Sequence, residues 1–164
     1  MRLLILSDSH TDLKTMQSAV RRENPDVILH LGDHFTDAQA LHDAFPDIPL
    51  HAVEGNTDCA PGAPAELLLP FAGKLLYMTH GHLFGVKLGI SGIARKGKEV
   101  GADLVLFGHT HKPLLCNEGQ MLLINPGSVG KCARGLTYHM STYGVVTIEH
   151  GELRCDIREE RKRD

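Results

Sequence analysis

The sequence has no tryptophan, few aromatic residues and no long apolar run, and each absence excludes a class of protein. There are only five phenylalanines and three tyrosines among 164 residues. No apolar run approaches the roughly 20 residues that a membrane-spanning helix needs, so we expect no membrane partner. An uninterrupted run of only four apolar residues, 3–6, precedes Ser7, whereas a secretory signal needs roughly 7–15, so we expect no such signal.

Cysteine is scarce and charge is nearly balanced. The residues Cys59, Cys116, Cys132 and Cys155 form no C-x-x-C pair, which favours reduced thiols in a cytoplasmic protein over zinc ligands or a disulfide frame. A formal net charge of -3 gives no indication of a nucleic-acid partner. Histidine, in contrast, is abundant at eleven residues, and it is the commonest metal ligand and a common proton carrier.

Short apolar segments alternate with helical patterns along the chain. Segments rich in Leu, Ile and Val predict strands covered on both faces, at 2–7, 26–31, 49–53, 74–79, 104–107 and 121–124. Apolar positions at helical spacing predict helices at 12–23, 37–45 and 90–100. We expect a hairpin from 142–149 and 152–158 and a solvated tail at 158–164. This order predicts one α/β domain, residues 1–164, with two packed sheets and helices outside.

Polar side chains follow five of the predicted strands, at the point where each strand ends. Ligands bind beyond the carboxyl ends of strands in open α/β sheets, so we expect these side chains to meet at one edge. Residues i and i+2 of an extended segment project to the same side, which would place His109 beside His111. Seven side chains form the set: Asp8, His10, Asp33, Asn56, His80, His109 and His111.

The chemistry of this set suits divalent metal ions. Two carboxylates, one amide oxygen and four imidazoles are more ligands than one ion usually takes from protein. We therefore expect two ions, with one carboxylate bridging them. Oxygen and nitrogen ligands without thiolate favour Mn, Fe, Zn or Ni over Ca or a cysteine-bound zinc. Each short motif alone is most often structural, and the combination carries the prediction.

In this order the motifs resemble those of the calcineurin-like metallophosphoesterases. The family pattern D-x-H, G-D, G-N-[HTC]-[DE], H and G-H-x-H is matched by DSH (8–10), GD (32–33), GNTD (55–58), TH (79–80) and GHTH (108–111). The stretches LGDHFTDA, THGHLFG and NPGSVG are similar to the small bacterial and archaeal YfcE-type phosphodiesterases. The resemblance implies two mixed β-sheets packed face to face with flanking helices, the α/β/β/α metallophosphoesterase sandwich.

The resemblance also implies a role for each ligand and a reaction. Asp8, His10 and His111 would hold one ion, Asn56, His80 and His109 the other, and Asp33 would bridge. The family's usual ion is Mn²⁺ or Ni²⁺, with Fe or Zn as alternatives, and we expect Mn²⁺ here. Two such cations about 3.5–4 Å apart would clamp the oxygens of a small phosphate ester, and a metal-bound hydroxide would attack phosphorus. The implied activity is that of a phosphodiesterase.

One position departs from the larger family members, whose histidine is thought to protonate the leaving group. Thr57 stands there in this sequence. A positioned acid is typically worth roughly 10²–10⁴-fold, so we expect Thr57 to shift preference towards diesters or aryl esters. Asp58 matches the family's acidic position and is expected to orient Asn56 or a ligand histidine. His34 and His82 could face the substrate, and we count Asp58 and His34 as candidate catalytic residues.

The remaining polar features are expected to be structural. The turn at 125–128 should brace the metal site from behind, with a phosphate contact by Ser128 as the alternative. Loops such as 59–70 and 82–92 should form the specificity surface. The basic side of the helix at 90–100 should be solvated surface. Structural or surface roles are assigned to five other histidines: His30, His42, His51, His139 and His150.

Several alternatives stay open. Within the enzyme class, the chain could be a phosphomonoesterase or a cyclic-nucleotide phosphodiesterase. The small subunit of the eukaryotic retromer resembles this fold and serves mainly in protein interaction, so a non-catalytic scaffold is a further reading. Retention of all seven ligand positions favours an enzyme. An H-x-H amidohydrolase is disfavoured, because its (β/α)₈ barrel typically takes about 250 residues. Exposed sheet edges leave a homodimer open.

Overall fold

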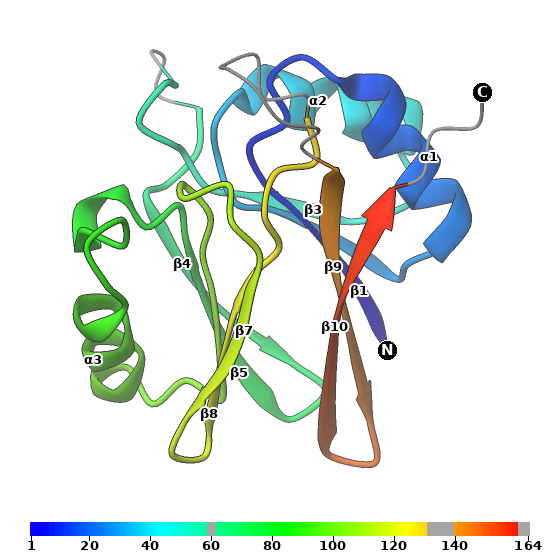
Figure 1. The fold of residues 1–164 in the computed structure, drawn as a ribbon. Helices are drawn as coiled ribbons and strands as arrows, with labels where there is room; N and C mark the ends of the chain where they lie inside the picture. The colour runs from blue at the N-terminus through cyan, green and yellow to red at the C-terminus, as the bar shows by residue number, and fades with distance from the viewer. Residues whose placement is uncertain (59–61, 131–139, 161–164) are drawn as a thin grey trace.

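Two five-stranded β-sheets packed face to face form the centre of the molecule, and helices lie outside them (Figure 1). This computed structural model describes residues 1–58, 62–130 and 140–160. The α/β/β/α arrangement expected from the sequence is therefore confirmed. Cys59, Cys132, His139 and residues 161–164 of the expected tail lie outside the described residues.

The first sheet is mixed, with the strand order β10-β9-β1-β2-β3. Its strands are β1 (Arg2–Leu6), β2 (Val27–His30), β3 (Leu50–Ala52), β9 (Ser141–Glu149) and β10 (Glu152–Glu160). The central strand β1 runs parallel to β2 and antiparallel to β9. The predicted hairpin is the antiparallel pair β9–β10 at one edge of this sheet.

The second sheet is also mixed, with the strand order β4-β5-β6-β8-β7. Its strands are β4 (Glu66–Phe71), β5 (Lys74–Thr79), β6 (Leu104–Leu106), β7 (Leu114–Glu118) and β8 (Met121–Asn125). The three central strands β5, β6 and β8 are parallel, and the edge strands β4 and β7 each pair antiparallel with a neighbour. Parallel strands bring their carboxyl ends to one edge, which is where the candidate ligands follow.

Among the described residues, three α-helices flank the sheets, with α1 and α2 outside the first sheet and α3 outside the second (Figure 1). They are α1 (Leu13–Glu23), α2 (Phe35–Ala44) and α3 (Ser91–Glu99), and a 3-10 turn, η1 (His82–Phe84), precedes α3. The Asp12 carboxylate caps α1 by accepting from the Thr15 N–H at 3.2 Å. No helix in the described part of the chain combines the length and apolarity needed to cross a bilayer.

Strand β1 shows why the sequences of the central strands are continuous apolar runs. Leu3 and Ile5 pack between the two sheets, whereas Leu4 and Leu6 pack against α1 and α2. All four are fully buried. Because successive side chains of a strand point to opposite faces, a strand covered on both sides is apolar at every position.

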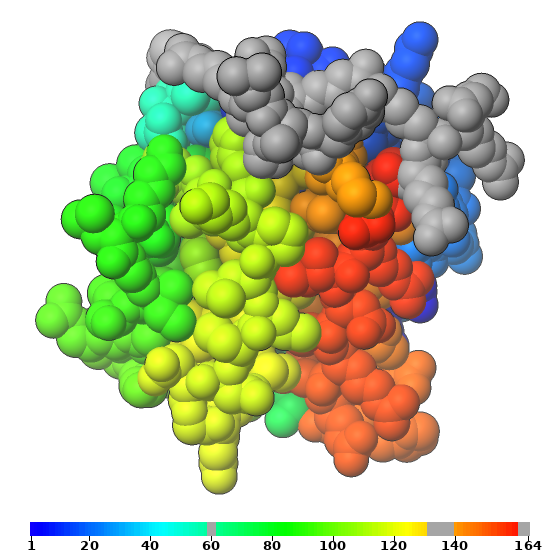
Figure 2. Space-filling model, in the orientation of Figure 1, coloured from blue at the N-terminus to red at the C-terminus, as the bar shows by residue number. Residues whose placement is uncertain are grey.

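The sequence predictions missed the two edge strands of the second sheet. Strand β4 begins inside the segment 59–70 that was expected to be a loop, and it ends one residue beyond that segment. Pro70 lies in this strand, and proline is not typical of strands. An edge strand tolerates it, because the N–H groups on its outer side need no partner strand. Strand β7 is short and half polar. It lies beside β10 of the other sheet, and Figure 2 shows these two edges next to each other on one face of the molecule.

The expectation of a solvated tail from residue 158 was wrong for residues 158–160. Strand β10 continues to Glu160, and ion pairs between exposed arginines and buried carboxylates join it to α1. The Glu23 carboxylate, 1% exposed, accepts from Arg158 at 2.7 Å and also from Arg2. Arg22 pairs with Glu160 at 2.7 Å. These contacts tie the C-terminal strand to the helix layer.

Candidate metal centre

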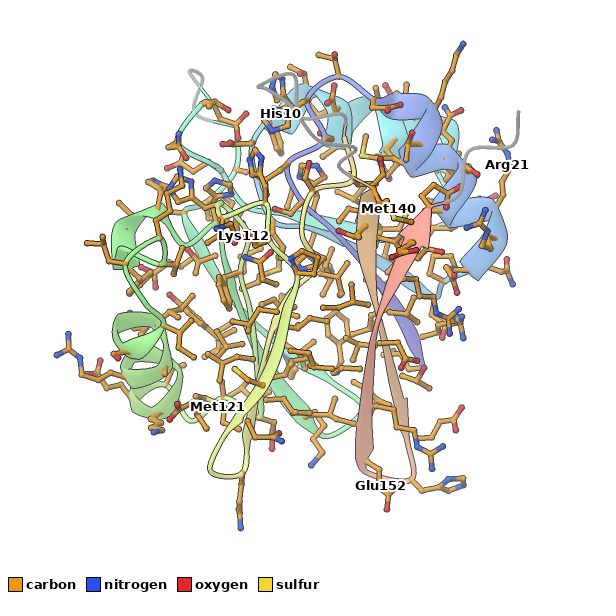
Figure 3. The ribbon with its side chains drawn as sticks, in the orientation of Figure 1. His10, Arg21, Lys112, Met121, Met140 and Glu152 are labelled. Atoms are coloured by element: carbon orange, nitrogen blue, oxygen red, sulfur yellow. The ribbon has the colours of Figure 1, made fainter. Side chains whose placement is uncertain are left out.

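The polar segments that follow β1, β2, β5 and β6 converge at one end of the molecule, where the ends of the two sheets meet (Figure 1). Two sets of three side chains there could each hold a metal ion, with ligand atoms within 4.8 Å of one another. One set is Asp8, His10 and His111, and the other is Asp8, Asp33 and His80. Figure 3 shows the labelled His10 at this end. Asp8 is common to both sets.

In the first set, a buried carboxylate faces two partly buried imidazoles. Asp8 Oδ1 lies 2.9 Å from His111 Nε2. His111 Nε2 in turn lies 3.3 Å from His10 Nε2. The other oxygen, Asp8 Oδ2, accepts from the Ser7 hydroxyl at 2.5 Å and from the His109 N–H at 3.2 Å. One carboxylate oxygen is thus held by the protein, and the other is directed at the imidazoles.

In the second set, His80 is the central residue. Its Nε2 lies 3.4 Å from Asp33 Oδ1, 4.0 Å from Asp8 Oδ1 and 3.2 Å from His109 Nδ1. The His80 Nδ1–H donates to the Leu31 carbonyl at 2.8 Å, which leaves the Nε2 lone pair facing the carboxylates. Fixing the tautomer from behind in this way is how proteins prepare histidine for a metal. The donor set therefore fits divalent cations.

The loop that carries Asn56 lies against Asp33. The Thr57 N–H donates to Asp33 Oδ1 at 3.1 Å. A Cβ atom on Gly55 would overlap the Asp33 carboxylate, so only glycine allows this approach. Asn56 and Thr57 are both exposed in the turn that follows β3. The structure thus brings the loop of Asn56 to the same place as the other candidates.

The backbone at the site is strained, not extended. Asp8, His10, Asp33, His109 and His111 all have positive φ, between 45° and 67°. This left-handed conformation is costly for residues with a side chain and is typical of functional sites. The i, i+2 argument from an extended strand was therefore wrong in its geometry. Its residues do meet at the site, but His109 lies beside His80 and His111 beside His10.

A second layer of side chains supports these loops, and its central member is one of the histidines that were expected to be structural or at the surface. His30 is fully buried under the site. Its Nδ1 accepts from the Gly32 N–H at 3.3 Å, and its Nε2 lies 3.3 Å from the Ser9 hydroxyl. The Ser9 hydroxyl lies 2.7 Å from an Asp37 carboxylate oxygen. His30 thus joins the residue before Asp33 to the residue between Asp8 and His10. Its position at the end of a strand was the available signal.

The turn at 125–128 braces the site from behind, as expected. Asn125 Nδ2 donates to the Gly108 carbonyl at 2.8 Å and to the Thr110 hydroxyl at 3.0 Å. The Ser128 hydroxyl donates to the Asp8 carbonyl at 2.8 Å. These bonds hold the backbone on both sides of the candidate ligands. Ser128 is therefore occupied with backbone, which favours the structural role over phosphate contact.

The candidate catalytic residues lie close to the candidate ligands, but their contacts differ. The Asp58 carboxylate accepts from the Phe35 N–H at 2.7 Å and the Gly55 N–H at 2.8 Å, so it joins the Asn56 loop to the start of α2. The His34 ring lies edge-on to that of His10, with centroids 5.2 Å apart. The His82 ring lies 5.5 Å from that of His80. His34 and His82 flank the candidate ligands, whereas Asp58 acts on the backbone.

Protonation at the site favours cation binding. Burial alone would raise the pKa of Asp8, but a hydrogen bond with His111, the His80 ring and the Ser7 hydroxyl together hold that pKa below its ordinary value. Burial lowers the pKa of His10, and burial lowers that of His109 to about 4. An ionised carboxylate among neutral imidazoles is the state that a metal ion requires.

Comparisons with known proteins agree with this geometry. Residues 1–151 match the family model described as the calcineurin-like phosphoesterase superfamily domain. The probable metallophosphoesterase YsnB of Bacillus subtilis is 33% identical over 152 residues, which is 92% of this chain and 86% of YsnB. Phosphodiesterase YfcE of Escherichia coli is 37% identical over 75 residues, 44% of this chain and 37% of YfcE. A crystal structure from Streptococcus pneumoniae, described as a predicted phosphoesterase, superposes with a TM-score of 0.81 at 28% identity, covering 97% of this chain and 89% of that one.

Proposed function

This chain belongs to the calcineurin-like phosphoesterase superfamily, and we propose that it is a phosphodiesterase that works with two divalent metal ions. The observation that carries the proposal is the arrangement around Asp8. Its buried carboxylate faces His111 on one side and the His80–Asp33 pair on the other. The two sets share Asp8 and bring together five polar residues that are otherwise far apart in sequence.

The proposed ligand sets follow the pairs of close nitrogen atoms. Asp8, His10 and His111 would hold one ion, and Asn56, His80 and His109 the other, with Asp33 between them. The distances His10–His111 and His80–His109, 3.3 Å and 3.2 Å, support this division. We propose Mn²⁺ as the ion, with Ni, Fe or Zn as alternatives, because the donors are oxygen and nitrogen without thiolate.

The chain's own residues prepare the site for a phosphate ester. When bound, the two ions supply the positive charge that attracts phosphate oxygens and lower the pKa of water. Asp8 and Asp33 carry only two negative charges between them, so the loaded site would stay net positive. His80 is held in one tautomer by Leu31, and Asp58 holds the Asn56 loop in place. These groups fix the geometry before any substrate arrives, as electrostatic catalysis requires.

Preference for diesters is the finer part of the proposal. It rests on Thr57, which is exposed beside Asp33 and offers no strong acid for an alkoxide leaving group. The name of the relative YfcE, a phosphodiesterase, points the same way. Phosphomonoesterase and cyclic-nucleotide phosphodiesterase activities are the alternatives. A cytoplasmic location and a small phosphate ester as partner belong to the same proposal.

One panel of measurements tests these points. Purified protein is assayed for bound metal, and then for hydrolysis of bis(para-nitrophenyl) phosphate, para-nitrophenyl phosphate and cyclic AMP with added Mn²⁺. We expect the diester to be hydrolysed fastest, and the Asp33→Asn variant to be inactive. Faster hydrolysis of the monoester or of cyclic AMP would replace the diesterase by that activity. Absence of both metal and hydrolysis would favour a protein-interaction scaffold, and sedimentation of the same sample tests for a homodimer.

A further inference from the structure

A pocket of about 590 Å³ opens beside the candidate metal centre. We name it the Lys87–Lys112 pocket, after the two lysines that line it. Its other walls are mainly apolar and include Val86, Ile90 and Phe107. The volume lies within the roughly 300–1,000 Å³ of typical small-molecule sites. It sits between the segment that follows η1 and the segment that joins β6 to β7.

The pocket and the metal centre share the same two loops. Val86 packs against Gly81, directly after His80, where a Cβ atom would approach it to 3.0 Å. On the other loop, Thr110 lines the pocket and lies in the chain between His109 and His111. The Thr110 hydroxyl is held by Asn125 at 3.0 Å, so this wall is fixed. A group bound at the ligand histidines would therefore have its substituent within reach of the pocket.

The two lysines of the pocket carry charge that the described residues do not neutralise. Lys87 and Lys112 are exposed and form no ion pair within the described part of the chain. The lysines of α3 differ, since Lys96 pairs with Glu66 and Lys98 with Glu118, each at 3.1 Å. Those pairs agree with the expected solvated surface on α3. None of the described residues that line the pocket is acidic, so the two lysines make its field positive.

Lys87 directly follows Val86 in the segment after η1, and Lys112 directly follows His111. Figure 3 shows Lys112 in the same half of the molecule as His10. The pocket is thus an electropositive, apolar-walled extension of the candidate metal centre, and charge complementarity defines what fits it.

We propose that the Lys87–Lys112 pocket binds the organic part of the substrate, and that this part is a ring or similarly flat apolar group bearing a second anionic group. This inference rests on the proposed function, because the pocket would take the substituent of a phosphate held at the metal centre. Val86, Ile90 and Phe107 would cover the apolar group, and the lysines would pair with the anion. A phosphate and a carboxylate share this chemistry.

Matched substrates test the inference in the Mn²⁺-loaded protein. Each is an aryl para-nitrophenyl phosphate whose aryl group carries a carbamoyl, a carboxylate or a phosphonate substituent. We expect kcat/KM for the two anionic esters to exceed that for the neutral carbamoyl ester roughly tenfold. The difference should come mainly from a lower KM for the anionic esters. Lys87→Gln and Lys112→Gln should each reduce that preference. Lys98→Gln, which removes the same charge at the far end of α3, should keep it.

The relative kcat/KM values of the two anionic esters identify the natural anion. A higher value for the phosphonate ester indicates a phosphate, and a higher value for the carboxylate ester indicates a carboxylate. Equal kcat/KM for all three esters would overturn the inference. So would a preference that survives in the Lys87→Gln, Lys112→Gln double variant as it does in Lys98→Gln.

A binding measurement separates this inference from the proposed function. The probe is para-carboxyphenylphosphonate, with its carbamoyl analogue as control, added to metal-free protein while backbone amide NMR signals are followed. We expect shifts at residues 86–90 and 110–114 that weaken in the double lysine variant. If the probe binds but none of the esters is hydrolysed, the proposed function is refuted and the inferred binding role of the pocket is supported. If the esters are hydrolysed but the probe causes no such shifts, and kcat/KM does not depend on the two lysines, the inferred role of the pocket is refuted and the proposed function is supported.

Discussion

His80, at the end of β5, donates its Nδ1 hydrogen to the carbonyl oxygen of Leu31, directly after β2 in the other sheet, at 2.8 Å. Both groups are buried. The bond therefore joins the two sheets at the candidate metal centre and fixes which nitrogen of His80 faces Asp33. A single side chain both sets the spacing of the two sheet ends and presents a lone pair to a cation.

Replacing His80 should weaken metal binding more than replacing a supporting residue does. We expect His80→Ala to lower Mn²⁺ affinity by more than the roughly 10–100-fold typical of losing a residue behind a ligand. Calorimetric titration of metal-free protein with Mn²⁺ measures this. His150→Ala, in the exposed turn between β9 and β10, is the matched control. Wild-type Mn²⁺ affinity in His80→Ala would contradict the ligand assignment.

Asn125 should act on the metal centre through the loop it holds. Its amide donates to the Gly108 carbonyl and the Thr110 hydroxyl, on both sides of His109. We expect Asn125→Ala to lower phosphoesterase activity roughly 10–100-fold and to weaken Mn²⁺ binding, with the fold retained by circular dichroism. Asn117→Ala, on the exposed edge strand β7, should match the wild type. Equal activity of the two variants would show that the brace is dispensable.

Thr57 should govern which leaving groups are hydrolysed. An imidazole at this exposed position beside Asp33 could supply a proton that the threonine hydroxyl does not. We expect Thr57→His to raise hydrolysis of alkyl phosphate esters relative to aryl esters by roughly tenfold or more. The measurement is the ratio of kcat/KM values, with Thr57→Ser as the control. An unchanged ratio would remove Thr57 as the determinant.

Burial of His30 predicts a pH-dependent stability. Burial lowers the pKa of His30 from an ordinary 6.5 to about 4. Between these values the unfolded chain binds a proton that the folded chain does not, so stability falls as the pH is lowered. The slope from this residue approaches about 1.4 kcal/mol per pH unit. His109, with a pKa of about 4, adds to it in the same direction.

Urea denaturation of metal-free protein at several pH values between about 7 and 5 measures this slope. We expect His30→Gln to be less stable than the wild type at neutral pH but to lose less stability as the pH falls. The exposed residue His150, changed to Gln, should leave the slope unchanged. Parallel curves for the wild type and His30→Gln would show that folding does not lower the pKa of His30.

Glu23 should be a main determinant of stability at the C-terminal edge. Its buried carboxylate accepts from Arg158 and from the Tyr143 hydroxyl, each at 2.7 Å. Removing it leaves a buried hydroxyl and two arginines without their acceptor, so we expect Glu23→Ala to lower the free energy of unfolding by about 2–4 kcal/mol. The exposed Glu159→Ala should change it by less than about 0.5 kcal/mol. Similar denaturation midpoints for both variants would refute this.

The sequence located the strands in the interior of each sheet, because strands covered on both faces are mainly apolar. The edge strand β3, the three helices and the β9–β10 hairpin were located as well. The missed strands β4 and β7 lie at sheet edges, where one side faces solvent and the apolar pattern weakens. The end of β10 was missed because ion pairs with α1 stabilise it, and such long-range pairs leave no local pattern.

For the site, the order of residues at strand ends was enough to bring most of the candidates together. The structure places Asp8, His10, Asp33, His80 and His111 in two close sets, and His109 beside His80. Their left-handed backbone left no pattern in the sequence, and the signal for the support from His30 was its position at the end of a strand. Both depend on contacts between loops that are distant in sequence, such as the Gly32 and Ser9 bonds to one imidazole.

Strand β1 lies in the middle of the first sheet, with β2 on one side and β9 on the other. During synthesis on the ribosome, β2 emerges soon after β1, but β9 begins only at Ser141. Val129 and Ser128, which bind the backbone of Ser7 and Asp8, also emerge late. The nascent chain therefore exposes one edge of its central strand, and an unfinished Asp8 loop, until translation has passed β9. The candidate metal centre can therefore be completed only late in the synthesis of the chain.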